Sequence, residues 1–286
     1  MRATLMYAAH DVRVEDVADP RIQQPTDAVV RIVLSCVCGS DLWPYKSQAP
    51  TDNPRHMGHE FLGVVVAPFV WADNTCAYCG EGLQTSCPHG GQWGVNGVDG
   101  GQGQAARVPL ADGTLVKLPV GEDSELLPDL LTLSDVLCTG YHAARTAGVR
   151  RGDTVTVVGD GAVGLSAVIA ARLLGAEQII LMGRHRARTD LGRDFGATDV
   201  VAERGDEGVV RVRELTGGEG SRKVLECVGL KDALVQGFGV VRAGGTISRV
   251  GAPQFTEVPF GFADARRRQP SHEWVLSEVL GISDRY

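Results

Sequence analysis

The most constraining feature of the sequence is a glycine motif that stands between a strand-like and a helix-like segment. The motif is GDGAVG, with glycines at Gly159, Gly161 and Gly164 and an apolar Val163. It follows DTVTVVG, an apolar run typical of a strand buried on both faces of a parallel sheet. It opens AVGLSAVIAARLLGA, whose apolar residues recur on one side of a helix. In that context the motif favours a dinucleotide site over a merely structural turn, because the glycines let backbone amides approach a pyrophosphate.

Strand-like and helix-like segments continue to alternate after this motif. QIILMG, DVV, KVLECVG and GGTISRVG are typical of strands, while LGRDFGA and ALVQGFGVVRA are typical of helices. Such alternation predicts an α/β fold with a doubly wound parallel sheet over residues 134–260. Residues 1–133 carry short β-branched runs with much of the glycine and proline, and we expect them to form a separate β-rich domain.

Composition excludes several classes of protein. The chain has 286 residues, of which 43% are hydrophobic, so it can bury a sizeable core in one or two domains. A net charge of −7 argues against a surface for nucleic acid or anionic membranes. The amino terminus lacks an apolar signal core and no apolar run is long enough to span a bilayer, which predicts a soluble, cytoplasmic protein. Its seven cysteines are then expected to be reduced, and clustered ones to bind metal.

Three of these cysteines lie in the segment DNTCAYCGEGLQTSC, at Cys76, Cys79 and Cys87. Asp73 precedes Cys76 by the same interval that separates Cys76 from Cys79. A closed tetrahedral zinc site of three thiolates and one carboxylate is chemically reasonable. The spacing alone leaves three interpretations open. They are an emptied relic of a site, a complete site with the carboxylate as fourth ligand, and three thiols that lie close by chance.

Two shorter motifs further upstream contain residue types that bind zinc in catalytic sites. Cys-Gly-Ser-Asp occupies positions 38–41, just past a strand-like run, and Gly-His-Glu occupies positions 58–60. A thiolate and an imidazole are suitable ligands of a catalytic zinc, and a hydroxyl beside them can take a substrate proton. Taken one at a time, Cys38 is better explained as a small core residue and His59 as a loop residue.

The order of these motifs resembles that of the zinc-dependent medium-chain alcohol dehydrogenases, in which a GroES-like catalytic domain precedes a Rossmann domain. The resemblance runs from the amino terminus to about Pro259 and rests on CGSD, GHE, the cysteine segment and GDGAVG, in that order. It implies a GroES-like domain over residues 1–133 and a Rossmann domain over residues 134–260. It also implies a catalytic zinc whose ligands are Cys38, His59 and Asp135, with Asp135 favoured over Cys138.

The same resemblance implies a structural zinc in the cysteine segment. Its four ligands would be Asp73, Cys76, Cys79 and Cys87, with Asp73 in the place of the first cysteine of the family pattern. Such a closed site braces a loop that has little core of its own and performs no chemistry. The alternative is an emptied or weakened site.

The resemblance further implies roles for individual residues in hydride transfer between an alcohol and a nicotinamide. Glu60 would stand beside the catalytic zinc, and Ser40 would accept the hydroxyl proton of the substrate. Thr139 and the backbone of Val250 would support the nicotinamide. Trp43 occupies the place of the histidine that continues the proton relay in many relatives, so the relay beyond Ser40 is left open and Trp43 is expected to line the substrate pocket.

The residues after the second Rossmann strand predict the coenzyme. An NAD enzyme carries there, roughly twenty residues after the glycines, an acid that accepts from the ribose 2′-hydroxyl. In this chain the place is Gly183, and Arg184, His185, Arg186 and Arg188 follow. Without the acid a 2′-phosphate is not repelled, and a guanidinium can bind it through two hydrogen bonds, so we expect NADP with Arg184 as main contact. A solvated basic turn would explain the arginines but not the absent acid.

The chain departs from the family pattern in two places. After GHEFLGVV a hairpin of the small barrel is missing, and after EVPFGFAD the segment ARRRQPSHEWVLSEVLGISDRY matches neither a sixth Rossmann strand nor a return to the catalytic domain. We therefore expect residues 261–286 to be an aberrant tail without regular structure. An exposed sheet edge would lower stability and impair the usual homo-oligomer.

Three classes of function compete on this sequence. The preferred one is a zinc-dependent oxidoreductase that uses NADP and acts on a small alcohol or carbonyl compound. The alternative is a truncated or degenerate relative that keeps the zinc and nucleotide motifs but has no activity. A zinc-free enzyme similar to quinone oxidoreductases is disfavoured by Cys38, His59 and the cysteine segment.

Overall fold

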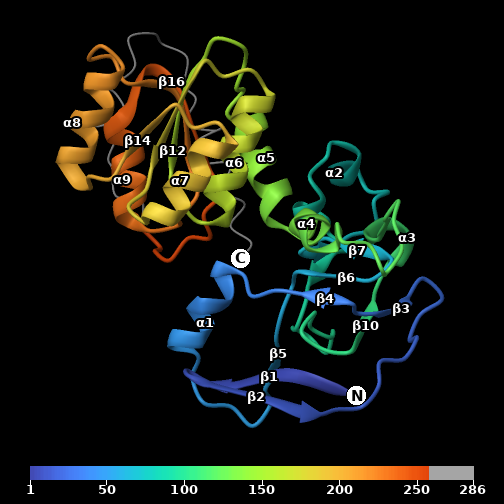
Figure 1. Ribbon diagram of the computed structural model, residues 1–286. Coiled ribbons are helices and arrows are strands. Elements are labelled where there is room, and N and C mark those ends of the chain that lie inside the picture. The colour runs from blue at the N-terminus through green and yellow to red at the C-terminus, as the bar shows by residue number, and fades with distance from the viewer. Residues whose placement is uncertain (258–286) are drawn as a thin grey trace. The chain divides into compact units, whose positions relative to one another are not determined.

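The computed structural model describes residues 1–257, which fold into two compact units (Figure 1). The first unit is Met1–Asp135, and the second begins at Val136. The predicted aberrant tail, residues 261–286, lies outside the described residues. None of the helices in the described part is long and apolar enough to cross a membrane.

The first unit is built mainly from short strands. They are β1 (Arg2–Ala8), β2 (Asp11–Asp16), β3 (Ala28–Arg31), β4 (Leu34–Ser35), β5 (Arg55–His56), β6 (Phe61–Leu62), β7 (Val65–Ala67), β8 (Val70–Trp71), β9 (Gly91–Gln92), β10 (Ala105–Val108) and β11 (Val116–Lys117). They pair antiparallel in the orders β2-β1-β5, β10-β3, β11-β7-β6-β4 and β8-β9. Between them lie the helical turns η1 (Gly39–Asp41), α1 (Leu42–Ser47), α2 (Ala77–Gly80), η2 (Gln84–Ser86), α3 (Ala111–Thr114), α4 (Leu127–Leu131) and η3 (Thr132–Ser134).

Strand β6 lies between two apolar clusters of the first unit. Phe61 packs edge to face on the buried Trp93, with ring centroids 5.0 Å apart. Leu62 points to the opposite side of the strand and packs with Val66 and Leu131. Because both faces of β6 are buried, the three residues just before it, 58–60, are fixed in position. The predicted loss of a hairpin after β6 stays a prediction.

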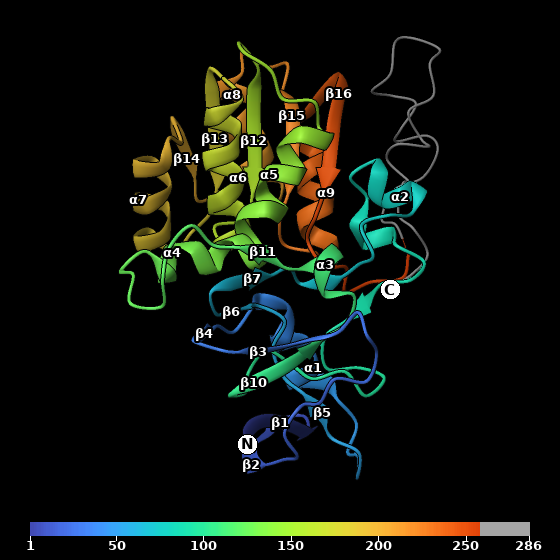
Figure 2. The same ribbon diagram turned by 90° about the vertical axis from the view of Figure 1, so that its right-hand side faces the viewer.

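The second unit is a parallel sheet with helices on both faces (Figure 2). Its strands are β12 (Thr154–Val158), β13 (Gln178–Met182), β14 (Asp199–Val201), β15 (Ser221–Glu226) and β16 (Val241–Arg249). Its helices are α5 (Val136–Thr146), α6 (Ala162–Leu173), α7 (Arg186–Phe195), α8 (Gly205–Leu215) and α9 (Lys231–Val240). The strand order in the described part is β14-β13-β12-β15-β16, with parallel pairing throughout, which confirms the predicted doubly wound fold.

Alternating residues of the central strands pack against the helices on the two faces of this sheet. Val155 and Val157 of β12 pack in a cluster with α5 and α6, whereas Val158 packs in the cluster that contains residues of α8 and α9. Helix α5 lies very close to α6, because a Cβ on Gly140 would come within 2.6 Å of the Ala167 backbone nitrogen. Glycine is therefore required at this helix crossing.

Two details of the second unit differ from the sequence prediction. The helix predicted over ALVQGFGVVRA ends at Val240, and Val241 begins strand β16 instead. The reason is tertiary, because Val241 is buried in the sheet core and its pairing with Ser221 is followed by an irregularity in the β15–β16 register. Helix α8 was not predicted. The predicted lack of a sixth strand concerns residues beyond those that the structure describes.

Candidate metal centres and coenzyme site

The first cluster of candidate metal ligands unites the two upstream motifs with Asp135. Cys38, His59, Glu60 and Asp135 each offer a ligand atom, and these atoms all lie within 4.8 Å of one another. The Cys38 Sγ lies 3.7 Å and the His59 Nε2 3.4 Å from Asp135 Oδ2. Cys138, the alternative third ligand, is an exposed residue on α5 and is not in this cluster.

A buried acid that sequence reasoning left without a role holds the histidine. Asp41 ends η1, and its Oδ1 lies 3.4 Å from His59 Nδ1. Its Oδ2 accepts the Cys38 backbone N–H at 3.0 Å. A ligating histidine commonly donates its second ring N–H to a carboxylate, which fixes the tautomer and leaves the other nitrogen for the metal. The signal in the sequence was the position of the acid, in the same tetrapeptide as Cys38.

The His59 ring lies among two carboxylates and a thiol. Burial disfavours the imidazolium, but hydrogen bonds with Asp135, Asp41 and Cys38 outweigh it and raise the pKa of His59 to about 12. Glu60 adds a further buried carboxyl group, whose Oε2 accepts from the Cys36 thiol at 2.9 Å while its Oε1 has no hydrogen-bond partner. An orphaned carboxyl oxygen beside a thiol, an imidazole and another carboxylate fits a divalent metal ion.

Two further candidate residues, Ser40 and Trp43, follow Cys38 within five positions of the sequence. The Ser40 Oγ lies 3.3 Å from His59 Nε2 and is thus next to the candidate ligands. Trp43 lies on α1, where its carbonyl accepts from the Ser47 hydroxyl and the Lys46 ammonium group lies 5.6 Å from its ring centroid. Its expected place in a substrate pocket stays a prediction.

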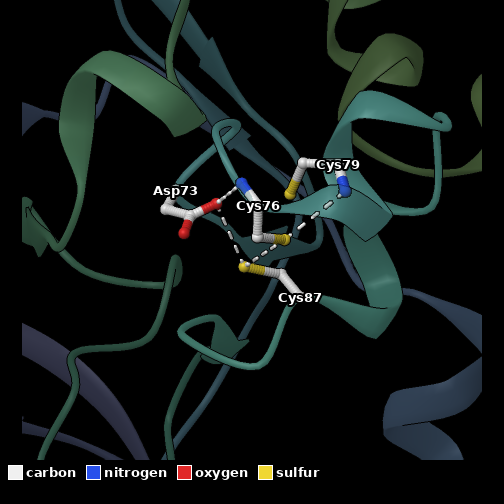
Figure 3. Close-up of side chains that lie close together, drawn as sticks. All are labelled: Asp73, Cys76, Cys79 and Cys87. Carbon is white, nitrogen blue, oxygen red and sulfur yellow. Dashed lines mark hydrogen bonds between the residues drawn. The ribbon is translucent and has the colours of Figure 1, made fainter.

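The second cluster lies in the loop between β8 and β9 (Figure 3). Asp73, Cys76, Cys79 and Cys87 point their side chains toward one another, with ligand atoms within 4.8 Å. The Cys87 Sγ lies 3.5 Å from Asp73 Oδ1 and 3.9 Å from Cys76 Sγ. Asp73 Oδ1 also accepts the Thr75 and Cys76 backbone N–H groups at 2.9 and 3.1 Å, which shapes the start of the loop.

A histidine that sequence reasoning missed, His89, contacts the Asp73 carboxylate of this cluster. The Nδ1 of the exposed His89 lies 2.5 Å from Asp73 Oδ2. This hydrogen bond is the largest cause that lowers the pKa of the Asp73 carboxyl group. Burial, and then the neighbouring thiols of Cys76 and Cys87, raise the pKa of Cys79 to about 12. Three crowded thiols and an ionised carboxylate form a donor set that fits a tetrahedral zinc ion.

The glycine loop of the second unit has the backbone shape that a dinucleotide requires. Gly159 has φ +113°, a conformation that side chains disfavour, and a Cβ on Gly164 would overlap the Gly159 carbonyl. Gly161 is the N-cap of α6, and a Cβ there would meet only open space. Val163 lies in the first turn of α6. The loop therefore leaves room at the amino end of α6, where a phosphate is favoured.

The basic segment after β13 is anchored to this loop. Gly183 lies next to Asp160. The Asp160 Oδ2 accepts the His185 backbone N–H at 2.8 Å and lies 2.9 Å from Nδ1 of the His185 ring. Arg184 is exposed, and Arg186 is 94% exposed and lies 3.6 Å from Asp190 on the same helix.

Two predicted nicotinamide contacts also lie in the second unit. Thr139 is on α5, and Val250 follows β16, where its backbone N–H donates to the Glu226 carbonyl at 2.9 Å. The Gly251 N–H donates to the same carbonyl, so this backbone is held against the end of β15. The nicotinamide contacts of Thr139 and Val250 stay a prediction.

Comparison with known proteins gives the same order of domains. Residues 24–120 match the family model of the alcohol dehydrogenase GroES-like domain, and residues 162–273 match that of the zinc-binding dehydrogenases. Together the two matched domains define the class of zinc-binding dehydrogenases. The chain belongs to the zinc-dependent medium-chain alcohol dehydrogenase family.

Individual relatives are similar over most of the chain. Zinc-type alcohol dehydrogenase B of Aspergillus flavus is 33% identical over 93% of this chain, which spans 66% of the length of that relative. A medium chain reductase/dehydrogenase of Acremonium sp is 32% identical over 92% of this chain and 97% of its own length.

Solved structures of the family are similar in fold. An alcohol dehydrogenase from Thermus sp. ATN1 is 34% identical, with a TM-score of 0.85 over 94% of this chain and 82% of that one. A zinc-binding dehydrogenase from Sinorhizobium meliloti 1021 is 25% identical, with a TM-score of 0.74 over 93% and 81% of the two chains.

Proposed function

We propose that this protein is a zinc-dependent alcohol dehydrogenase that transfers a hydride between a small alcohol and NADP, forming an aldehyde or ketone. The observation that carries the proposal is the buried cluster of Cys38, His59, Glu60 and Asp135, whose ligand atoms lie within 4.8 Å of one another. Its donor types suit a catalytic zinc, and a dinucleotide loop is present in the same chain.

Each residue of the cluster has a distinct part in this proposal. Cys38, His59 and Asp135 would hold the zinc ion, which when bound would supply a Lewis acid for the alcohol oxygen. Ser40, 3.3 Å from His59 Nε2, would accept the hydroxyl proton of the substrate while passing its own proton on. The Glu60 Oε1 is buried without a hydrogen-bond partner, and its carboxylate would help to balance the charge of a zinc ion held by the cluster.

The coenzyme proposal rests on the segment after β13. Gly183 has no acidic side chain, and Arg184 is exposed next to it, so a 2′-phosphate meets a guanidinium, assisted by Arg186 or Arg188. The related structure from Sinorhizobium meliloti 1021 is bound to NADP, which supports this choice. Thr139 and the backbone of Val250 are proposed to contact the nicotinamide.

The second cluster is proposed to hold a structural zinc. Asp73, Cys76, Cys79 and Cys87 supply three sulfur atoms and one oxygen, and a site with four protein ligands has no open position for a substrate. Zinc here would brace the loop between β8 and β9.

Metal analysis and turnover together test the proposed function. We expect two zinc ions per chain in the purified protein and reduction of NADP with at least one member of a panel of primary and secondary alcohols. Asp135→Asn should remove activity and the zinc of the first cluster, whereas Asp129→Asn, at an exposed acid nearby, should change neither. Well under one zinc per chain in folded protein would contradict the proposal. Two zinc ions and bound coenzyme without turnover would instead identify a non-catalytic relative.

A further inference from the structure

A buried acid from the glycine loop lies where the side chain of residue 183 would begin. Asp160 is the second residue of GDGAVG and is 7% exposed. A Cβ on Gly183 would overlap the Asp160 Cβ, and it would lie 2.8 Å from the Asp160 Cγ and 2.9 Å from its Oδ2. Residue 183 is therefore a glycine because Asp160 occupies its space. Position 183 itself has no acid, but the Asp160 carboxylate of the glycine loop lies next to it at the end of β13.

The partners of Asp160 are the basic residues that follow Gly183. Its two oxygens lie 2.9 and 3.1 Å from His185 Nδ1, and its Oδ2 accepts the His185 backbone N–H at 2.8 Å. Arg188 lies 3.9 Å away. Burial alone would raise the pKa of Asp160, but the hydrogen bonds from His185 and the charges of His185 and Arg188 outweigh it and lower that pKa. Asp160 is thus an ionised acid among the residues expected to meet a 2′-phosphate.

We infer that Asp160 is a specificity-determining residue of the coenzyme site, which limits the preference for NADP by placing a carboxylate beside the basic segment. The inference rests on the proposed use of a nicotinamide coenzyme. Asp160 acts in two ways that can be separated. Its charge repels a 2′-phosphate and occupies His185 and Arg188, while its hydrogen bond to the His185 N–H fixes the backbone next to Arg184.

Removing the Asp160 charge while keeping its hydrogen bond with the His185 N–H isolates the electrostatic effect. Asn at position 160 retains an oxygen that can accept the His185 N–H. In Asp160→Asn we expect the ratio of NADH to NADPH dissociation constants to rise about tenfold, from the loss of one close negative charge. Asp160→Ala also frees the backbone and should raise this ratio less. Asp194→Asn, at an exposed acid on α7, is the control and should leave the ratio unchanged.

Nucleotide fluorescence titrations with NADH and NADPH measure the four dissociation constants that each comparison needs. An unchanged or lower ratio in Asp160→Asn, with both coenzymes still bound, overturns the inference and leaves the proposed function intact. If the unmodified protein binds neither coenzyme, the proposed function fails first.

A paired exchange tests the spatial relationship itself. Gly183→Asp alone should destabilise the protein, because its side chain overlaps Asp160. Gly183→Asp combined with Asp160→Gly removes the overlap and moves the acid to the strand end, where it can accept from a ribose 2′-hydroxyl. We expect the double variant to recover thermal stability and to bind NADH more tightly than NADPH. A double variant no more stable than Gly183→Asp contradicts the assignment of Asp160 to the space of residue 183.

Discussion

The Nδ1 atom of His59 lies 3.4 Å from Oδ1 of Asp41, while the Nε2 atom of the same ring lies 3.4 Å from Asp135. The imidazole is thus held between one acid that orients it and another that shares the candidate metal cluster. Because Asp41 also accepts the Cys38 N–H, it positions two proposed ligands at once.

We expect Asp41→Ala to weaken zinc binding at the first cluster by about 10–100-fold, the usual effect of losing a carboxylate that orients a ligating histidine. Competition with a chromogenic chelator measures this affinity directly. Asp52→Ala, at an exposed acid in the same unit, is the control. Equal chelator curves for Asp41→Ala and the unmodified protein would show that Asp41 has no such role.

His89→Ala should loosen the second cluster without affecting the first. The imidazole holds Asp73 Oδ2, so its loss lets the carboxylate turn and should reduce zinc affinity at this site by about tenfold. Zinc released per chain during a chelator titration should show one weakened site and one unchanged. Glu81→Ala, at an exposed residue of the same loop, serves as control. Unchanged zinc affinity at both sites would show that His89 does not position Asp73.

A buried glutamate should make the stability of the second unit depend on pH. Glu226 is fully buried at the end of β15, where Oε1 accepts the Val228 and Gly229 N–H groups and Oε2 has no partner. Burial raises its pKa, against the hydrogen bonds and the charge of Arg249. The folded protein then holds a proton that the unfolded chain releases, so this group stabilises the fold at low pH and that contribution is lost as pH rises through the raised pKa.

Glu226→Gln removes that titration. Urea unfolding from acid to neutral pH should show the free energy of unfolding of the unmodified protein falling relative to the variant, by on the order of 1 kcal/mol. A constant offset from the lost charge would not alter this slope. Parallel pH profiles would contradict the raised pKa.

Two glycines of the second unit should respond differently to the same added methyl group. Gly140→Ala forces α5 away from the α6 backbone and should cost about 1–3 kcal/mol of unfolding free energy. Gly161→Ala meets open space and should leave the Tm nearly unchanged, but it should weaken NADPH binding because the methyl group enters the proposed phosphate position. Thermal melts and coenzyme titrations of both variants check the contrast, and the reverse pattern would refute it.

The parallel sheet was predictable because its strands are continuous apolar runs, as in Thr154–Val158, and strands buried on both faces need such runs. The end of α9 was not, because the burial of Val241 in the sheet overrides the local helical pattern. At the candidate sites, motifs pointed to Cys38, His59 and the cysteine loop. Asp160 and His89 were missed because their partners, His185 and Asp73, become neighbours only through folding.

The cysteine loop between β8 and β9 is closed by a strand ladder and, inside it, by the four candidate zinc ligands. Val70 pairs with Gln92 and Trp71 with Gly91, so a short strand ladder joins the two ends of the loop independently of its four candidate ligands. Most of the chain entropy of closing this loop is thus lost to the β8–β9 ladder, and a zinc ion inside it orders only the residues it encloses. The order inside the cysteine loop therefore depends on its own ligands more than on the rest of the first unit. Chelation should accelerate amide hydrogen exchange within residues 73–87 while the protection of β6 and β7 persists.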